Sequence, residues 1–276
     1  MIGIIVRGMA VGVTEIVPGV SGSTVAMIVG IYERLLHSLS ILTTRRRREA
    51  IPFLLTFGVG MMIGFTAALY VIDFLLDTYR TQTMMFFVGI IVGFLPYLWK
   101  ETVQQAQTGL QMKHYAIMAL SLCIVVIGQM AGGFHTMDGN NLSAAEYIFI
   151  VISGMLASTA LALPGISGSL ILTILGLYET ATTALMTLNL PIIAAIGSGM
   201  IAGVLFISKL IRYLLANYPA ATYAAMVGLV SGSIFAIFHS LEGTLNSQVI
   251  IMSLLTFLTG VISVILLNQT SHPRSE

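Results

Sequence analysis

One pattern of proline, glycine and serine occurs twice in the chain, and both times it interrupts apolar sequence. Residues 18–33 read PGVSGSTVAMIVGIYE and residues 164–179 read PGISGSLILTILGLYE, with nine of the 16 positions identical. A long sequence repeated within one chain is typical of a structural unit that is used twice. We therefore predict two copies of one unit, residues 1–134 and residues 135–276, within a single domain.

The composition places both copies in a membrane. Of the 276 residues, 57% are hydrophobic and 8% are charged, whereas soluble domains carry about 25% charged residues. A helix needs about 20 apolar residues to cross the hydrocarbon core. Ten apolar segments, five in each copy, predict an all-α, polytopic membrane protein: 2–17, 23–42, 51–77, 83–99, 115–134, 146–163, 169–188, 191–215, 223–240 and 249–267. The first segment lacks the charged region and cleavage site of a signal peptide, so we expect it to belong to the folded protein.

Five crossings in the first copy would turn the second copy upside down, and the charges agree with this. The connection with four arginines, Arg45 to Arg48, and the connection 99–114 with two lysines are predicted to be cytoplasmic. The segments 135–146 and 180–190 contain no Lys or Arg and are predicted to be outside. An outer turn at 78–82, which holds Arg80, is the exception. The sequence predicts two inverted five-segment repeats, as found in secondary transporters.

The two proline-glycine motifs predict broken helices. Pro18 and Pro164 disfavour helix in the residue before them, and new helices are expected after the loops, with Ser21 or Ser23 as the first N-cap. Non-helical main chain at membrane depth is tolerated only when it is buried in protein or lines a wet cavity. Hydropathy alone leaves a spanning pair of helices open as an alternative, but the shortness of 2–17 favours a re-entrant hairpin in each copy.

Two loops that enter from opposite faces would meet near the midplane, and each would present a helix N-terminus. Such ends attract anions, phosphate in particular. The predicted anion site consists of Gly19, Ser21, Gly22, Ser23, Thr24, Gly165, Ser167, Gly168 and Ser169. The alternative is close helix packing, for which small residues are also used. We interpret two other small-residue runs, GVGMMIG at 58–64 and GSGMIAG at 197–203, as packing seams of this kind.

Two charged residues lie inside the first apolar segment. Arg7 and Glu15 are eight residues apart, so they lie on roughly one face of a helix. Arg7 suits a phosphate group, and Glu15 is a candidate proton or cation site. The alternatives are that the two charges compensate each other or that Arg7 snorkels to the interface. Secondary candidates, which could instead be interfacial anchors, are Tyr32, Glu33, Tyr178 and Glu179.

The residues of the sequence give little support for catalysis or for a bound cofactor. A serine nucleophile in the G-x-S-G motifs needs a base, and the five histidines lie at segment ends or in loops: His37, His114, His135, His239 and His272. We therefore predict no catalytic residues and no enzyme. We also expect no metal, no nucleotide cofactor and no nucleic-acid partner, which leaves a proton or sodium ion as the candidate coupling ion.

The chain resembles the bacterial polyprenyl-phosphate transporter family. The resemblance rests on PGVSGST…GIYE and PGISGS…GLYE, on Arg7–Gly8 and Glu15, and on T-x4-V-G-x3-G at 83–93 and 222–232. The first loop reads SGS where many relatives have SGG. The resemblance implies a multi-pass protein of the bacterial cytoplasmic membrane that returns undecaprenyl phosphate from the outer to the cytoplasmic leaflet, for peptidoglycan and other envelope polymers, by alternating access. Its implied partners are the polyprenyl phosphate and membrane lipids. Whether the protein forms a homo-oligomer is left open.

Three other functions remain open on the residues alone. A transporter of a small anionic solute or a receptor that only binds a lipid would share the two loops, and an intramembrane serine hydrolase is the less favoured third. An opening between helices that admits a prenyl chain would separate lipid transport from transport of a small anion.

Overall fold

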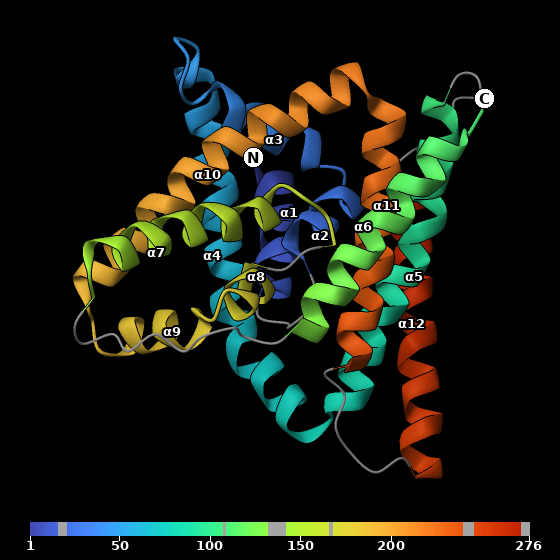
Figure 1. Cartoon of the computed structure of the whole chain (residues 1–276). Coiled ribbons are helices and arrows are strands. Elements are labelled where there is room, and N and C mark those ends of the chain that lie inside the picture. The colour runs from blue at the N-terminus through green and yellow to red at the C-terminus, as the bar shows by residue number, and fades with distance from the viewer. Residues whose placement is uncertain (16–20, 107–108, 132–141, 166–167, 240–245, 272–276) are drawn as a thin grey trace.

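The structure is a computed structural model that describes residues 1–15, 21–106, 109–131, 142–165, 168–239 and 246–271. Within these residues the regular structure is helical and no strand occurs (Figure 1). The α-helices are α1 (Ile2–Thr14), α2 (Gly22–Ile28), α3 (Tyr32–Ile41), α4 (Arg47–Thr78), α5 (Arg80–Gln105), α6 (Met112–Ala131), α7 (Ala144–Ala157), α8 (Gly168–Ile174), α9 (Tyr178–Met186), α10 (Leu190–Asn217), α11 (Pro219–His239) and α12 (Ser247–Ser271), and a 3₁₀ turn covers Ser158–Leu161.

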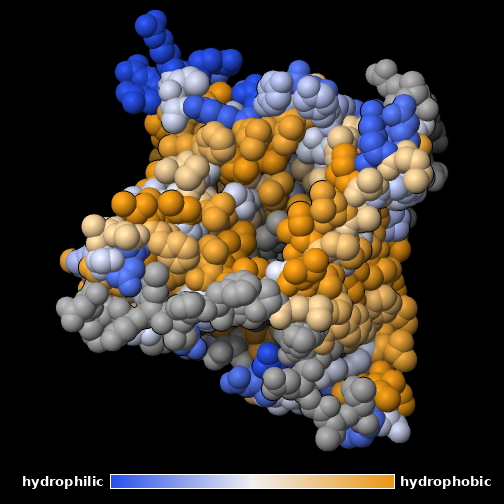
Figure 2. Space-filling view, in the orientation of Figure 1, coloured by the Kyte–Doolittle hydropathy of each residue, from blue (hydrophilic) through white to orange (hydrophobic). Residues whose placement is uncertain are grey.

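Five of the helices in this part of the chain, α4, α5, α6, α10 and α12, are long and apolar enough to cross a membrane. A sixth crossing results if the bent pair α2 and α3 counts as one span. Apolar side chains cover the middle of the molecule, and hydrophilic side chains gather toward its upper and lower ends (Figure 2). The chain is therefore an all-helical, multi-pass membrane protein.

Glycines allow α1 to pack directly on α4. A Cβ atom built on Gly60 would lie 2.3 Å from the carbonyl oxygen of Ile5, and one on Gly64 would lie 2.2 Å from that of Met9. Real Cβ atoms do not approach main chain so closely, so only glycine fits at these two positions. The interpretation of 58–64 as a packing seam is confirmed.

The second copy repeats this contact between α7 and α10. A Cβ atom on Gly199 would lie 2.0 Å from the carbonyl oxygen of Val151, and one on Gly203 would lie 2.4 Å from that of Met155. The seam interpretation of 197–203 is confirmed as well. Each copy thus fixes its first helix to its first long helix by main-chain contact.

The remaining long helices form a second bundle. Helix α5 packs along α12 and helix α6 packs along α11, while α5 and α11 touch each other. The T-x4-V-G-x3-G segments supply the close approaches, because a Cβ atom on Gly89 would lie 2.1 Å from the carbonyl oxygen of Phe257 and one on Gly228 would lie 2.2 Å from that of Met118. A large buried cluster of the core lies here, around Phe94 and Val230.

Two apolar segments that we expected to be single helices are broken in the structure. The segment 23–42 divides into α2 and α3, whose axes differ by 119°, and the segment 169–188 divides into α8 and α9. The breaks lie at Gly30 (φ +67°) and Gly176 (φ +72°), the glycines of GIYE and GLYE. At the first break the Ile31 amide donates to the carbonyl of Ala26, as in a Schellman motif. A left-handed glycine therefore ends each short helix, which hydropathy does not reveal.

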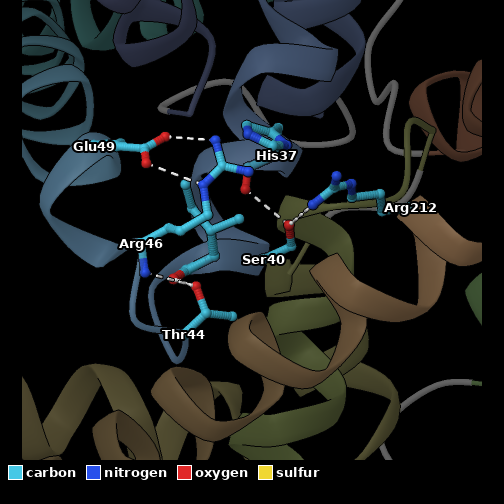
Figure 3. Close-up of polar contacts among 7 residues, drawn as sticks. His37, Ser40, Thr44, Arg46, Glu49 and Arg212 are labelled. Carbon is cyan, nitrogen blue, oxygen red and sulfur yellow. Dashed lines mark hydrogen bonds and ion pairs between the residues drawn. The ribbon is translucent and has the colours of Figure 1, made fainter.

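The basic connections gather at one end of the molecule. The α3–α4, α5–α6 and α10–α11 connections all lie at the top of Figure 1. Arg212 of α10 donates a hydrogen bond of 2.9 Å to the hydroxyl of Ser40 in α3, which joins the second copy to the first (Figure 3). Nearby, Arg46 forms a surface ion pair with Glu49 at 2.7 Å, and this pair holds the pKa of the Glu49 carboxyl below its ordinary value. The α3–α4 and α5–α6 connections are those that the sequence predicts to share the cytoplasmic side.

Candidate functional site

The first Gly/Ser loop joins α1 to α2. Helix α1 ends at Thr14 and α2 begins at Gly22, with Ser21 at the N-cap position in extended conformation. The predicted position of the cap is thus right, but Ser21 makes no side-chain capping bond to α2. Its hydroxyl lies 2.7 Å from the Ser23 hydroxyl instead and also donates to the carbonyl oxygen of Ala160 at 3.4 Å. The candidate Gly19 lies outside the described residues.

The structure brings the first loop into contact with the second. Ser23 donates to the carbonyl oxygen of Ala160 at 3.1 Å, and the amide of Gly165 donates to the Thr24 hydroxyl at 3.0 Å. Ser21, Ser23 and Thr24 are all buried. Residues about 140 positions apart in sequence are therefore held together by side chains of the first copy and main-chain groups of the second.

The described part of the second loop contributes main-chain groups to the contact. Gly165 has a φ of +90°, and a Cβ atom built on it would lie 2.4 Å from the main chain of Leu229 and Val230. The loop is thus pressed against α11 at a position that only glycine fits. Gly168 begins α8, while Ser167 and the side chain of Ser169 lie outside the described residues.

The carboxylate of Glu15 lies at the start of α2. It accepts a hydrogen bond from the amide of Gly22, and a Cβ atom on Gly22 would lie only 2.0 Å from its Oε1 atom. Glu15 keeps an exposed surface despite this contact. A carboxylate of the protein itself thus stands where the sequence predicts the anion.

Arg7 lies on α1, exposed, two helical turns before Glu15. Among the residues that the structure describes, the ion pair within 4.0 Å is Arg46–Glu49, so Arg7 and Glu15 do not pair with each other. The alternative in which these two charges compensate each other is wrong for this conformation. The guanidinium of Arg7 is left for another anionic partner or for the interface.

The secondary candidates differ between the copies. Tyr32 is 4% exposed, and its hydroxyl donates to the carbonyl oxygen of Ala162 in the second loop. The interpretation of Tyr32 as an interfacial anchor is therefore wrong, because it is a buried link between the copies. Tyr178 is 45% exposed, which agrees with an anchor. Glu33 and Glu179 are exposed in the first turns of α3 and α9.

Sequence reasoning missed the main-chain acceptors. Ala160 and Ala162 carry no polar side chain, yet their carbonyl oxygens receive the hydroxyls of Ser21, Ser23 and Tyr32. Ala160 lies within the turn at Ser158–Leu161, which is 3₁₀ and not α, and Ala162 directly follows this turn. The sequence signal for these acceptors was Pro164. It predicts that a helix ends nearby, but it does not predict where the carbonyl groups of Ala160 and Ala162 point.

The contacts of the serines do not resemble those of a nucleophile. Ser21 and Ser23 bond to each other and to a main-chain carbonyl, and none of these groups is a base. His114 accepts a hydrogen bond from the Gln111 amide at the start of α6. No group of three or more His, Cys, Asp or Glu side chains that would hold a metal ion occurs within the described ranges.

Comparison with known proteins gives consistent results. A family model described as undecaprenyl phosphate translocase-like (VCA0040-like) matches residues 11–253. A Staphylococcus aureus protein named polyprenyl-phosphate transporter is 36% identical over 266 residues, which cover 94% of this chain and 93% of the relative. A Vibrio cholerae protein of the same name is 30% identical over 241 residues, covering 83% of this chain and 74% of the relative. No solved structure matches the chain.

Proposed function

The chain belongs to the undecaprenyl phosphate translocase-like family, and from that premise we propose that it carries a polyprenyl phosphate across the bacterial cytoplasmic membrane, returning the lipid from the outer to the cytoplasmic leaflet. The phosphate is bound between the two Gly/Ser loops while the prenyl chain stays in an apolar environment. The protein acts as a transporter and not as an enzyme.

The observation that carries this proposal is the meeting of the two loops. Ser21, Ser23 and Thr24 of one copy are held within hydrogen-bond distance of Ala160 and Gly165 of the other. A phosphate that enters between the loops replaces these internal partners with its own oxygens, for which hydroxyl and amide donors are well suited. Opening and closing of the contact would then accompany binding and release.

Arg7 and Glu15 supply the charges of this mechanism. Arg7 counters the phosphate charge, because its guanidinium is exposed and unpaired with Glu15. Glu15 leaves the start of α2 when the phosphate arrives, since two anions cannot share one small set of donors. Its release from the Gly22 amide couples phosphate binding to uptake of a proton or a sodium ion.

Alternating access between two inverted repeats is the proposed route. The helix pairs α1–α4 and α7–α10 have equivalent glycine seams, and α5–α12 and α6–α11 have equivalent close approaches, which supports two copies of one fold. The N-terminus and the α3–α4 connection lie at the same upper end of Figure 1, which supports a first hairpin that enters and returns.

Leaflet exchange in liposomes tests the proposal. The protein is reconstituted with a polyprenyl phosphate labelled on its headgroup, and accessibility of the label is followed with and without a pH gradient. We expect the wild type to accelerate exchange and the double variant Ser21→Ala/Ser23→Ala to lose about tenfold or more, as two phosphate donors are removed. Ser198→Ala is the matched control, because the Ser198 hydroxyl bonds only to the carbonyl of Ala195 in its own helix.

The results of the exchange assay distinguish a lipid transporter from a lipid receptor and from a carrier of small anions. Binding of the lipid without exchange would favour a receptor, and exchange of inorganic phosphate without the lipid would favour a carrier of small anions. Normal exchange by the double variant, with Arg7→Ala also normal, would refute the assignment of the phosphate to these loops.

A further inference from the structure

An apolar cavity of about 380 Å³ lies beside the first hairpin, between α1, α2, α4, α5 and α12. Val13 and Thr14 of α1 and Val25 of α2 form the wall nearest the loop, and Thr14 directly precedes Glu15. Phe86 and Ile90 of α5 form part of the opposite wall. Because Thr14 directly precedes Glu15 and Val25 directly follows Thr24, the cavity is lined by residues next to those proposed to bind the phosphate.

The hydroxyl groups of this wall have no free proton to donate to an occupant. The hydroxyl of Thr14 donates to the carbonyl of Val11, that of Thr83 to the carbonyl of Leu75, and that of Ser263 to the carbonyl of Gly260. All three hydroxyls are thus satisfied by nearby main chain, and the surface that they leave is almost entirely hydrocarbon. A water molecule needs two to four polar partners, so such a cavity favours an apolar occupant.

The size of the cavity fits a short piece of a branched chain. An apolar cavity of about 150 Å³ binds benzene, which has six carbons, so a cavity of about 380 Å³ holds roughly 15 carbons. An isoprene unit contributes five carbons, so two to three units fill the space. Protein interiors are packed closely, and an unfilled cavity of this size forfeits many contacts.

The cavity extends toward the end of the molecule opposite the basic connections. Leu75 lies in the last turn of α4 and Thr83 in the first turn of α5, on either side of the α4–α5 connection. The sequence predicts that this connection, 78–82, faces the outside. A chain held here would thus enter from the outer half of the bilayer.

We propose that this cavity binds the first two or three isoprene units of the polyprenyl phosphate, so that it selects a methyl-branched chain over the straight acyl chains of ordinary phospholipids. The inference rests on the proposed function. It gives the lipid tail a defined site next to the headgroup, whereas free diffusion of the tail in the bilayer would make the headgroup the sole basis of recognition. Because lipid tails are as apolar as the wall, selectivity comes from shape and packing.

Photo-crosslinking in nanodiscs tests this site. The probe is farnesyl phosphate with a diazirine in its terminal isoprene unit, and labelled peptides are identified by mass spectrometry. In the wild type we expect labelling of α5 and α12 around Ile90 and Ser263, suppressed by excess unlabelled polyprenyl phosphate and unaffected by phosphatidic acid. Ser263→Phe fills the cavity and should lower this labelling about tenfold. Ile262→Phe is the control, because Ile262 is 52% exposed on the outer side of the same helix.

A second variant keeps the test valid if Ser263→Phe misfolds. Ala10→Phe narrows the cavity from α1 and should give the same loss. Equal suppression by phosphatidic acid would show that any lipid chain occupies the cavity and would overturn the proposal. Labelling that polyprenyl phosphate suppresses but that lies elsewhere would overturn the tail site and leave the proposed function standing. A wild type without any labelling that polyprenyl phosphate suppresses would refute the proposed function itself.

Discussion

The two Gly/Ser hairpins, α1–α3 and α7–α9, have closely similar sequences but contribute different chemistry where they meet. The first copy offers side chains, the hydroxyls of Ser23, Thr24 and Tyr32, whereas the second offers the main-chain groups of residues 160–165. The positions of Arg7 and Glu15 in the first copy are Ser153 and Leu161 in the second. Within the described residues, the first copy thus contributes side chains to the contact and the second contributes main-chain groups.

This difference separates the residues of the repeat that maintain the fold from the residues that form the site. The glycines of the seams and the left-handed Gly30 and Gly176 recur in both copies, because each copy needs them to fold. Among the groups proposed to form the site, Arg7, Glu15 and Thr24 are replaced by Ser153, Leu161 and Leu170 in the second copy, whereas Ser21, Ser23 and Tyr32 recur as Ser167, Ser169 and Tyr178. Substitutions at equivalent positions should therefore have unequal effects.

The largest effect is expected at Gly165. The variant Gly165→Ala puts a methyl group 2.4 Å from the main chain of Leu229 and Val230 at a φ of +90°, which should destabilise the fold by about 3 kcal/mol or more. Gly168→Ala meets its nearest atom at 3.2 Å and should cost less than about 1 kcal/mol. Thermal unfolding in detergent measures both, and equal midpoints would contradict the close contact with α11.

Thr24→Val should have the next largest effect. It removes the acceptor of the Gly165 amide and leaves a buried donor unpaired, which costs about 1–3 kcal/mol. Thr222→Val is the control, because the buried Thr222 hydroxyl bonds only to the carbonyl of Tyr218 in its own turn. The unfolding midpoint should fall clearly for Thr24→Val and little for Thr222→Val.

Tyr32→Phe and Tyr178→Phe compare the same position in the two copies. Loss of the bond from buried Tyr32 to Ala162 should cost about 1 kcal/mol. Tyr178 is 45% exposed, so its change should leave the midpoint almost unmoved. A larger effect at Tyr178 would reverse the assignment of the structural link to the first copy.

The smallest effect concerns the start of each first helix. Helix α7 begins with a capping box in which Ser143 and Glu146 bond to each other, whereas α1 begins at Ile2, and Met1 at its N-cap position makes no side-chain capping bond. Bonds from Ser143 hold the pKa of the Glu146 carboxyl below its ordinary value of 4.5. The stability that this bond adds is full above pH 4.5 and is lost as the pH falls through the lower folded-state pKa. Unfolding midpoints of Ser143→Ala and wild type should therefore differ slightly at neutral pH and by less in acid, where the bond from the Glu146 amide to the Ser143 hydroxyl is left.

The sequence predicts those features whose cause is local. The membrane helices follow from apolar length, the seams at 58–64 and 197–203 from small-residue spacing, and the end of α1 from the proline that follows. The breaks at Gly30 and Gly176 were missed because apolar residues flank both glycines and hydropathy averages over them. A glycine before Tyr-Glu was the available signal, since left-handed glycines commonly end helices.

Features that depend on distant parts of the chain could not be predicted. The burial of Tyr32 depends on where Ala162 lies, and the contact of Glu15 with Gly22 depends on the path of the loop. The apolar cavity is lined by residues that look like any others facing a core, and its existence depends on how five helices leave space between them. Such properties arise from the packing of residues that are distant in sequence, and no short sequence motif marks them.

The glycine seams also decide how the molecule can move. Along α1–α4 and α7–α10 main chain touches main chain, with no long side chains between them that could change rotamer to permit sliding. Each hairpin and its long helix must therefore travel as one rigid body. The joint between the two bodies is bridged by Ser23–Ala160, Thr24–Gly165, Tyr32–Ala162 and Ser40–Arg212. A buried apolar cluster around Tyr32, Ala162 and Ile207 spans the same joint. In the proposed mechanism, these polar and apolar contacts would have to break before the two bodies could separate.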